Sequence, residues 1–157
     1  MKLDDKNHAH FSGEEYINTS FDALWKLVND EVALKEIFPG VKEIKTIGEN
    51  TYFIEMKTPF WGLPGDIWAR LEVNKNEQSG EVYSKIIGSG VGSTFNINLS
   101  IKIRDEKEKG IAVEWESDLY LNGRILSLPN PIIIRTSKRM IKKAVANLKL
   151  HLRENIK

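Results

Sequence analysis

Apolar and polar residues alternate along the middle of this chain, from Val41 to Leu121. A period of two is typical of strands that bury one face, because successive side chains of a strand point to opposite sides. Gly, Asn, Asp and Pro residues divide the stretch into segments, as turns do. The expected strands are Val41–Ile47, Tyr52–Thr58, Asp66–Asn74, Glu81–Gly88, Ser93–Arg104 and Gly110–Leu121. With short loops between them, they predict an antiparallel meander.

Other patterns flank this region. Residues His10–Ile17 predict one more strand, and two short stretches of helical spacing follow, for which Thr19-Ser20 and Asp30 offer N-caps. Pro39-Gly40 ends the second helix, since proline cannot continue it. At the C-terminus one apolar stripe at helical spacing predicts a single long helix, and it consists of Ile134, Ile141, Ala144, Val145, Leu148 and Leu152.

The two faces of each predicted strand differ in polarity. Every second residue from Phe95 to Ile103 is apolar, for example, and polar residues fill the positions between them. An apolar sheet face must be covered, and the long helix is the element available to cover it. We therefore expect an α+β fold, in which a curved antiparallel sheet of about seven strands wraps around the C-terminal helix and two short helices follow the first strand. Residues 10–157 form this single domain, and residues 1–9 form a flexible N-terminal tail.

Composition narrows the function classes. The chain has 157 residues, of which 41% are hydrophobic and 29% charged, as in ordinary globular domains. It contains no cysteine, which excludes disulfides, thiolate catalysis and cysteine-bound metal centres. The first residues are polar, so we expect no secretory signal, no membrane span and a cytoplasmic location.

No pattern of catalytic or metal-binding residues stands out. The three histidines, His8, His10 and His151, lack a metal-ligand spacing, and we expect them in the tail or on the surface. The acidic side chains at alternate positions from Glu114 to Asp118 fall on the polar face of their strand. We therefore expect no catalytic residue, no metal and no cofactor.

Charge is divided unevenly along the chain. From Asn130 to Lys157 there are eight basic residues and one acidic residue, a net charge of +7, although the whole chain carries only +1. Such a surface attracts anionic lipid, nucleic acid or an acidic partner, or it is simply the solvated side of an amphipathic helix. No aromatic residues alternate with the basic ones, so nucleic acid is not the expected partner. The candidate membrane or partner face consists of Arg135, Lys138, Arg139, Lys142 and Lys143.

Two further segments are unusually apolar. They are the loop Pro59–Gly65 and the stretch Ile125–Ile134, which leads toward the long helix and carries two prolines. We expect them either to meet at the mouth of an apolar cavity or to complete the core. The candidate cavity and entrance residues are Tyr52, Ile54, Met56, Phe60, Trp61, Leu63, Ile67, Phe95, Ile97, Leu99, Trp115, Ile133, Ile134 and Ile141. Polar residues that could fix a ligand, with facing left open, are Ser84, Asn96, Ser117 and Asn122.

Several short motifs resemble those of one family. They are Phe11-Ser12-Gly13, Trp25, Asp30-Glu31-Val32-Ala33-Leu34, Phe38-Pro39-Gly40-Val41-Lys42-Glu43, Gly88-Ser89-Gly90-Val91-Gly92 and Asn122-Gly123-Arg124. With the order of elements, they resemble the CoxG family, which is named for a component of carbon monoxide dehydrogenase and belongs to the START-like and plant-allergen superfamily, also called SRPBCC. The resemblance implies the helix-grip fold. The loop Pro59–Gly65 and the stretch Ile125–Ile134 are more apolar than the family pattern, which leaves the ligand open.

The expected function is binding or carriage of a hydrophobic small molecule, such as a lipid or an isoprenoid quinone. The resemblance also implies molybdenum hydroxylase subunits of the carbon monoxide dehydrogenase kind as partners, with a role in assembly, membrane recruitment or electron-acceptor delivery. The basic face would add peripheral contact with anionic lipid at the inner face of the membrane. Two alternatives stay open, namely a polyketide cyclase or aromatase-like enzyme and a docking module that uses the basic helix.

Overall fold

The structure is a computed structural model that describes residues 7–60 and 63–155, with only the backbone described for residues 153–155. Its strands are β1 (His8–Ile17), β2 (Val41–Gly48), β3 (Thr51–Lys57), β4 (Asp66–Asn76), β5 (Glu81–Gly90), β6 (Ser93–Asp105) and β7 (Ile111–Gly123). Its helices are α1 (Phe21–Val28), α2 (Glu31–Ile37) and α3 (Asn130–Asn155), with short 3-10 turns η1 (Lys107–Lys109) and η2 (Arg124–Ser127). The element order agrees with the sequence expectation.

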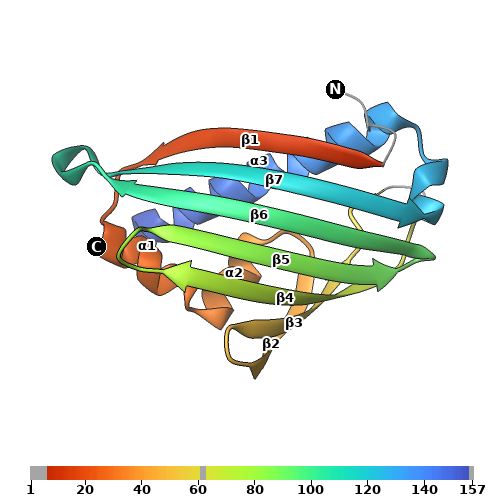
Figure 1. Ribbon diagram of the computed structural model, residues 1–157, viewed down its shortest axis with the longest axis horizontal. Coiled ribbons are helices and arrows are strands. Elements are labelled where there is room, and N and C mark those ends of the chain that lie inside the picture. The colour runs from red at the N-terminus through yellow and green to blue at the C-terminus, as the bar shows by residue number, and fades with distance from the viewer. Residues whose placement is uncertain (1–6, 61–62, 156–157) are drawn as a thin grey trace.

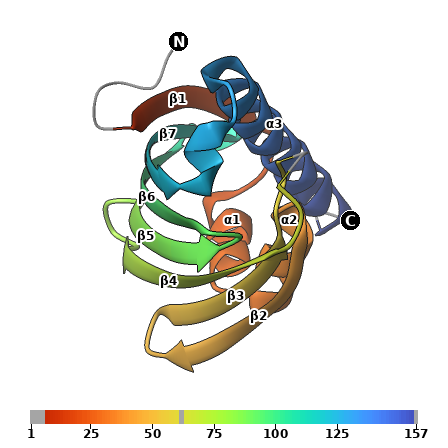
Figure 2. The ribbon, with the colours of Figure 1, turned by 90° about the vertical axis from the view of Figure 1, so that its right-hand side faces the viewer.

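All strands belong to one antiparallel sheet. Their spatial order is β1-β7-β6-β5-β4-β3-β2, so β2 to β7 form the expected meander and β1 pairs with the edge of β7. Figure 1 shows the outer face of the sheet, with α3 running behind it. Seen from one end in Figure 2, the sheet curves around the space that α3 borders. The face turned toward α3 is called the inner face below.

Side-chain caps start the two short helices after β1. Ser20 Oγ accepts a hydrogen bond from the backbone N–H of Ala23 at 3.1 Å, and Asp30 caps α2 in the same way. These bonds satisfy N–H groups that have no partner within the helix. The second helix then ends just before Pro39-Gly40, where the sequence predicts its end.

The first strand is longer than expected. It begins at His8, two residues before the expected start at His10, and so takes in the end of the segment that we expected to be a tail. Ala9 is 1% exposed and belongs to the core. Its small apolar side chain continues the alternation of buried positions along β1, which explains the extension. Residues 1–6 lie outside the described part of the chain.

The last helix also begins earlier than expected. α3 starts at Asn130, so Ile132–Ile134 form its first turn and are not an approach broken by proline. Pro131 is compatible with this start, because the N–H that proline lacks would have no partner in the first turn of a helix.

The buried side chains form three clusters. The loop-end cluster consists of Ala9, Phe11, Phe60, Leu63, Ile67, Phe95, Leu119, Leu121, Ile125, Ile133 and Ile134. The helix-end cluster consists of Ile17, Leu24, Leu27, Ala33, Ile37, Ile103, Ile111, Val113 and Leu152. The edge cluster, under β2 to β4, consists of Ile44, Tyr52, Ile54, Ala69 and Leu71. The start of α3 therefore packs in one cluster and its end in another.

We predict that replacing Ile133 by alanine destabilises the fold strongly. Ile133 is fully buried in the loop-end cluster, and such truncations cost about 2–5 kcal/mol. The matched control is Ile132→Ala on the same turn of α3, where the side chain is 40% exposed and the loss should stay below about 1 kcal/mol. Urea unfolding measures both variants, and equal losses would contradict the assigned packing of α3.

Candidate functional site

The candidate cavity residues all lie on the inner side of the sheet or on the elements that cover it, but they differ in burial. Eight of them are packed into clusters, namely Tyr52, Ile54, Phe60, Leu63, Ile67, Phe95, Ile133 and Ile134. The others are half-buried, namely Met56, Ile97, Leu99, Trp115 and Ile141. Trp61 lies outside the described residues.

The two apolar segments that the sequence analysis singles out do meet. Phe60 and Leu63 pack with Ile125 and Ile133 in the loop-end cluster. The backbone N–H of Leu63 donates to the Phe60 carbonyl oxygen at 3.1 Å, which forms a turn, and the N–H of Ile125 donates to Ser93 Oγ at 2.8 Å. The described residues of both segments are therefore part of the core that closes this end of the sheet.

The centre of the inner face is packed less completely than its ends. Leu99 is the middle residue of β6, and it is half-buried and belongs to none of the three clusters. The same holds for Ala144 and Val145, which lie on the apolar stripe of α3 between Ile141 and Leu148. We call Ser84, Leu99, Ser117, Ala144 and Val145 the central stretch.

The facing of the four candidate polar residues follows from the strand register. Leu99 pairs with Ser84 on β5 and with Ser117 on β7, and paired residues of neighbouring strands share a face. Both serines therefore belong to the inner face and are half-buried. Asn96 and Asn122 occupy alternate positions and are exposed on the outer face.

A glycine on β1 makes room for an inner-face tryptophan. A Cβ atom on Gly13 would lie 2.7 Å from Trp115 Cζ2 and 2.9 Å from Trp115 Nε1, so the indole ring lies directly against this glycine. Trp115 Nε1 is buried there and has no hydrogen-bond partner in the described part of the chain. The sequence analysis did not assign Gly13 to the site, although a glycine inside a strand is a known signal of close approach.

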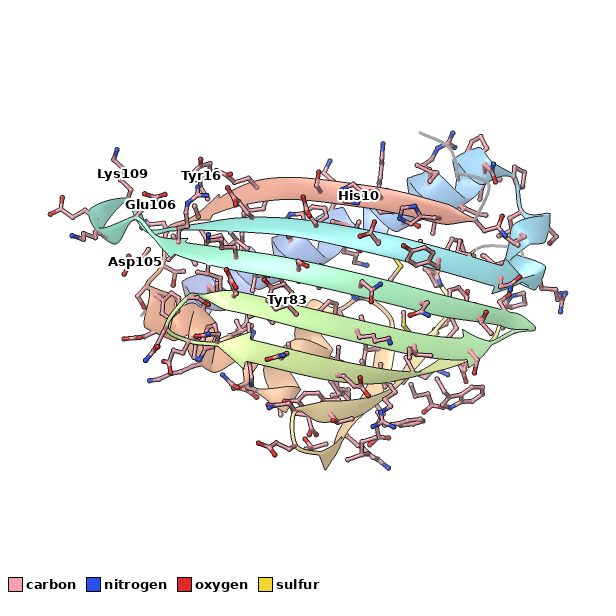
Figure 3. The ribbon with its side chains drawn as sticks, in the orientation of Figure 1. His10, Tyr16, Tyr83, Asp105, Glu106 and Lys109 are labelled. Atoms are coloured by element: carbon pink, nitrogen blue, oxygen red, sulfur yellow. The ribbon has the colours of Figure 1, made fainter. Side chains whose placement is uncertain are left out.

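The outer face of the sheet is polar and carries the acidic residues, as expected. Two open hollows lie on it, of about 400 and 340 Å³. Charged side chains such as Glu81, Lys102 and Glu114 line the larger one, together with Tyr83, which is labelled in Figure 3. Arg104 contacts Glu114 beside it. These hollows are unsuited to an apolar ligand, because burying an unpaired charge is costly.

Two histidines and one aspartate join β1 to β7 on the outer face. His8 Nε2 lies 2.7 Å from Asp118 Oδ1, and His10 Nδ1 lies 2.9 Å from the same oxygen. Hydrogen bonds with His10 and then with His8 hold the pKa of Asp118 below its ordinary value. The third histidine, His151, contacts Glu36 at 3.3 Å. All three therefore take part in surface contacts.

The candidate basic face is exposed along α3. Arg135, Lys138, Arg139, Lys142 and Lys143 are exposed, and none of them forms an ion pair within the described residues. In contrast, Lys149 Nζ binds Glu15 Oε2 at 3.0 Å. The basic side chains without an acidic partner therefore gather on the first half of α3, the half that starts in the loop-end cluster.

Two apolar side chains accompany the basic face. Ile132 is 40% exposed and Leu150 is 55% exposed. They are eighteen residues apart, which is five helical turns or about 27 Å, so both point to the same side of α3 as Arg139 and Lys143. This side of the helix therefore combines positive charge with exposed apolar groups.

The described residues offer neither a metal centre nor a membrane-spanning helix. Across residues 7–60 and 63–155, no group of three or more His, Cys, Asp or Glu side chains is placed to hold a metal ion. Within the same residues, no helix is both long and apolar enough to cross a membrane.

Solved structures place the protein in a structural class. A conserved protein from Geobacillus kaustophilus superposes with a TM-score of 0.85 at 14% identity, covering 93% of this chain and 96% of that one. The Zhui aromatase/cyclase from a Streptomyces species gives 0.73 at 9% identity and 96% of both chains. A START superfamily protein from Mycobacterium smegmatis gives 0.66 at 11% identity, covering 94% of this chain and 97% of that one. The fold is the START-like helix-grip fold, as expected.

A family comparison is more specific. The model of the CoxG family, which is described as a component of carbon monoxide dehydrogenase, matches residues 13–153. The protein belongs to the CoxG family. No curated protein matches the chain. The family and the fold together suggest hydrophobic ligand binding.

We predict that Asp118 stabilises the fold and that acid removes this contribution. A carboxylate whose pKa is lowered by folding stabilises above its unfolded pKa, near 4, and loses that effect as the pH falls through its folded pKa. The thermal midpoint of Asp118→Asn should therefore lie below that of the wild type at pH 5, by at most about 4 °C, and the difference should vanish toward pH 2.

The matched control is Glu116→Gln, which removes a neighbouring outer-face carboxylate that has no ion pair within the described residues. Its midpoint should follow the wild type at every pH. A deficit of Asp118→Asn that is equally large at pH 5 and pH 2 would contradict the assignment.

Proposed function

We propose that the protein binds or carries a hydrophobic small molecule, such as a lipid or a quinone-like compound, between the inner face of the sheet and α3. The central stretch is the observation that carries this proposal. Leu99, Ala144 and Val145 are apolar, face each other across the sheet–helix interface and belong to no packed cluster. Apolar side chains in this state gain free energy when a ligand removes them from water, at about 25 cal/mol per Å².

The polarity of the two faces favours the inner side as the binding site. Binding pockets are mostly apolar with few polar groups that fix the ligand. The inner face has this composition, with Met56, Ile97 and Ile141 half-buried around the central stretch. The hollows on the outer face are lined by charged groups and do not have it.

The basic face of α3 supports peripheral contact with an anionic membrane as a second part of the proposal. Each Lys or Arg near such a surface contributes about 1 kcal/mol to binding. Ile132 and Leu150 add exposed apolar groups on the same side of the helix. A carrier of a water-insoluble ligand needs a place to collect and release it, and this face provides one at the inner surface of a membrane.

Membership in the CoxG family supports a role beside a molybdenum hydroxylase of the carbon monoxide dehydrogenase kind. In that role the protein would assist assembly, recruit the enzyme to the membrane or deliver its electron acceptor. A hydrophobic ligand and a membrane-contacting helix are both compatible with delivery of an electron acceptor.

The aromatase-like alternative finds less support in the described residues. Acid–base catalysis needs titratable groups within reach of the substrate. Along the strands, the charged residues on the inner face are Glu15, Lys75 and Asp105, and each already has a hydrogen-bond partner. All three lie toward the helix end and away from the central stretch. The fold is shared with an aromatase/cyclase, but folds host many functions.

We predict that Leu99→Trp blocks ligand binding without unfolding the protein. The larger side chain would fill the space at the centre of the inner face, and affinity for the neutral probe N-phenyl-1-naphthylamine should fall at least about tenfold. The matched control is Asn98→Trp, one position along β6 on the outer face, which should bind like the wild type. Severe destabilisation by Leu99→Trp alone would show that the centre is already packed.

A second result would count against ligand binding. If native mass spectrometry and solvent extraction of freshly purified protein find no bound molecule, and the wild type fails to bind the probe, the proposal is wrong.

We predict that neutralising the basic face weakens membrane contact. The double variant Arg139→Gln/Lys143→Gln removes two charges worth about 2 kcal/mol together, which corresponds to about a 30-fold loss in binding to vesicles rich in phosphatidylserine. The matched control, Lys85→Gln/Lys102→Gln, removes two exposed charges from the outer sheet face. Vesicle co-sedimentation at several salt concentrations compares them, and equal losses in both variants would rule out a specific role for α3.

A further inference from the structure

Two serine hydroxyls interrupt the apolar inner face near its centre. Ser117 is the middle residue of β7, and Ser84 lies two strands away on β5, with Leu99 of β6 between them. Both serines are half-buried, and neither hydroxyl has a hydrogen-bond partner among the described residues. A polar group that faces an apolar space loses free energy unless it finds a partner. The two hydroxyls are therefore available to a ligand.

The other inner-face polar groups near them are already used or inaccessible. Ser93 Oγ accepts the backbone N–H of Ile125, and Trp115 Nε1 lies against Gly13. Ser137 Oγ on α3 donates to the carbonyl oxygen of its own helix at 2.8 Å. The serine pair is thus distinguished from its surroundings by having no partner within the described part of the chain.

The position of the pair in the sheet limits how a ligand lies. Neighbouring strands are about 4.8 Å apart, so the backbones at Ser84 and Ser117 are about 10 Å apart across β6. The curvature of the sheet, visible in Figure 2, turns their side chains toward the same space, opposite Ala144 and Val145. A polar head that reaches this point occupies the middle of the molecule, and the apolar part of the ligand extends from it toward an end.

The charges around the pair exclude an ionic head. Glu15, Lys75 and Asp105 are the charged strand residues on the inner face within the described part of the chain, and all have partners. An ion at the central stretch would have no counter-charge, and burying an unpaired ion costs several kcal/mol. A hydroxyl group, in contrast, donates to a neutral oxygen without any such cost.

We propose, on the basis of the proposed function, that the ligand is a neutral amphiphile whose carbonyl-type oxygen accepts hydrogen bonds from Ser84 and Ser117 at the centre of the sheet. The serines then decide which hydrophobic molecules bind: those with a hydrogen-bond acceptor in an uncharged head. They also set the orientation, with the head inside and the chain directed outward.

Two matched probes test this selectivity. Laurdan is a naphthalene ketone with a long alkyl chain, and its counterpart has the carbonyl group replaced by a methylene group. The wild type should prefer laurdan by about 2- to 13-fold for each hydroxyl engaged, which is the effect of one neutral hydrogen bond. The variant Ser84→Ala/Ser117→Ala should lose this preference and bind the methylene probe as tightly as the wild type does.

The control variant and a spectral readout separate hydrogen bonding from packing. Ser100→Ala removes a serine from the outer face of β6, next to the same strands, and should keep the preference. Hydrogen bonding to the ketone shifts its emission to longer wavelength, so bound laurdan should emit at shorter wavelength in Ser84→Ala/Ser117→Ala than in the wild type. Thermal unfolding checks that all variants are folded.

Each outcome decides between the two proposals. Equal binding of both probes, or a preference that survives in Ser84→Ala/Ser117→Ala, overturns the role of the serines while ligand binding stands. If neither probe binds to the folded wild type, ligand binding itself is overturned and the role of the serines with it.

Discussion

One helix has to cover the apolar face of a seven-stranded sheet, and the rest of the structure follows from this constraint. Strands lie about 4.8 Å apart, so seven of them span about 29 Å, whereas a helix with its side chains is about 10–12 Å across. α3 therefore covers only part of the inner face, although the sheet curves around it. Other elements close the ends: α1 and α2 at one, and η2 with Phe60 and Leu63 at the other. The centre, at Leu99, has α3 alone opposite it.

This arrangement separates the chemistry of the two sheet faces. Charged groups gather on the outer face, where Asp118 meets two histidines and Arg104 meets several carboxylates. The inner face keeps three charged strand residues within the described part of the chain, all with partners and all near the helix end. A neutral interior and a charged exterior favour binding of an uncharged molecule over chemistry at the centre. Gly13 belongs to the same design, because its missing side chain lets Trp115 lie against β1 and leaves space in front of it.

Much of the fold could be predicted from the sequence because period two and helical spacing are local signals. The strand order, the caps at Ser20 and Asp30, and the inner and outer faces of β6 all follow from them. The start of α3 could not be placed in this way, because Pro131 is compatible with both a helix start and a break. The central stretch could not be predicted either, because the space beside Leu99 depends on the curvature of the sheet and its distance from α3. Periodicity contains no information on either.

The two faces of α3 link the proposed ligand site to the proposed membrane contact. α3 is one continuous helix of 26 residues, and its start packs against Phe60 and Leu63 through Ile133. The basic side chains without an acidic partner among the described residues lie on this same half of the helix, whereas Lys149 on the other half is bound by Glu15. An anionic surface that attracts the basic face therefore approaches the loop end of the sheet. That end is closed by a loop and the first turns of α3, with no strand pairing to break, so the ligand's shortest route between the membrane and the centre passes through it.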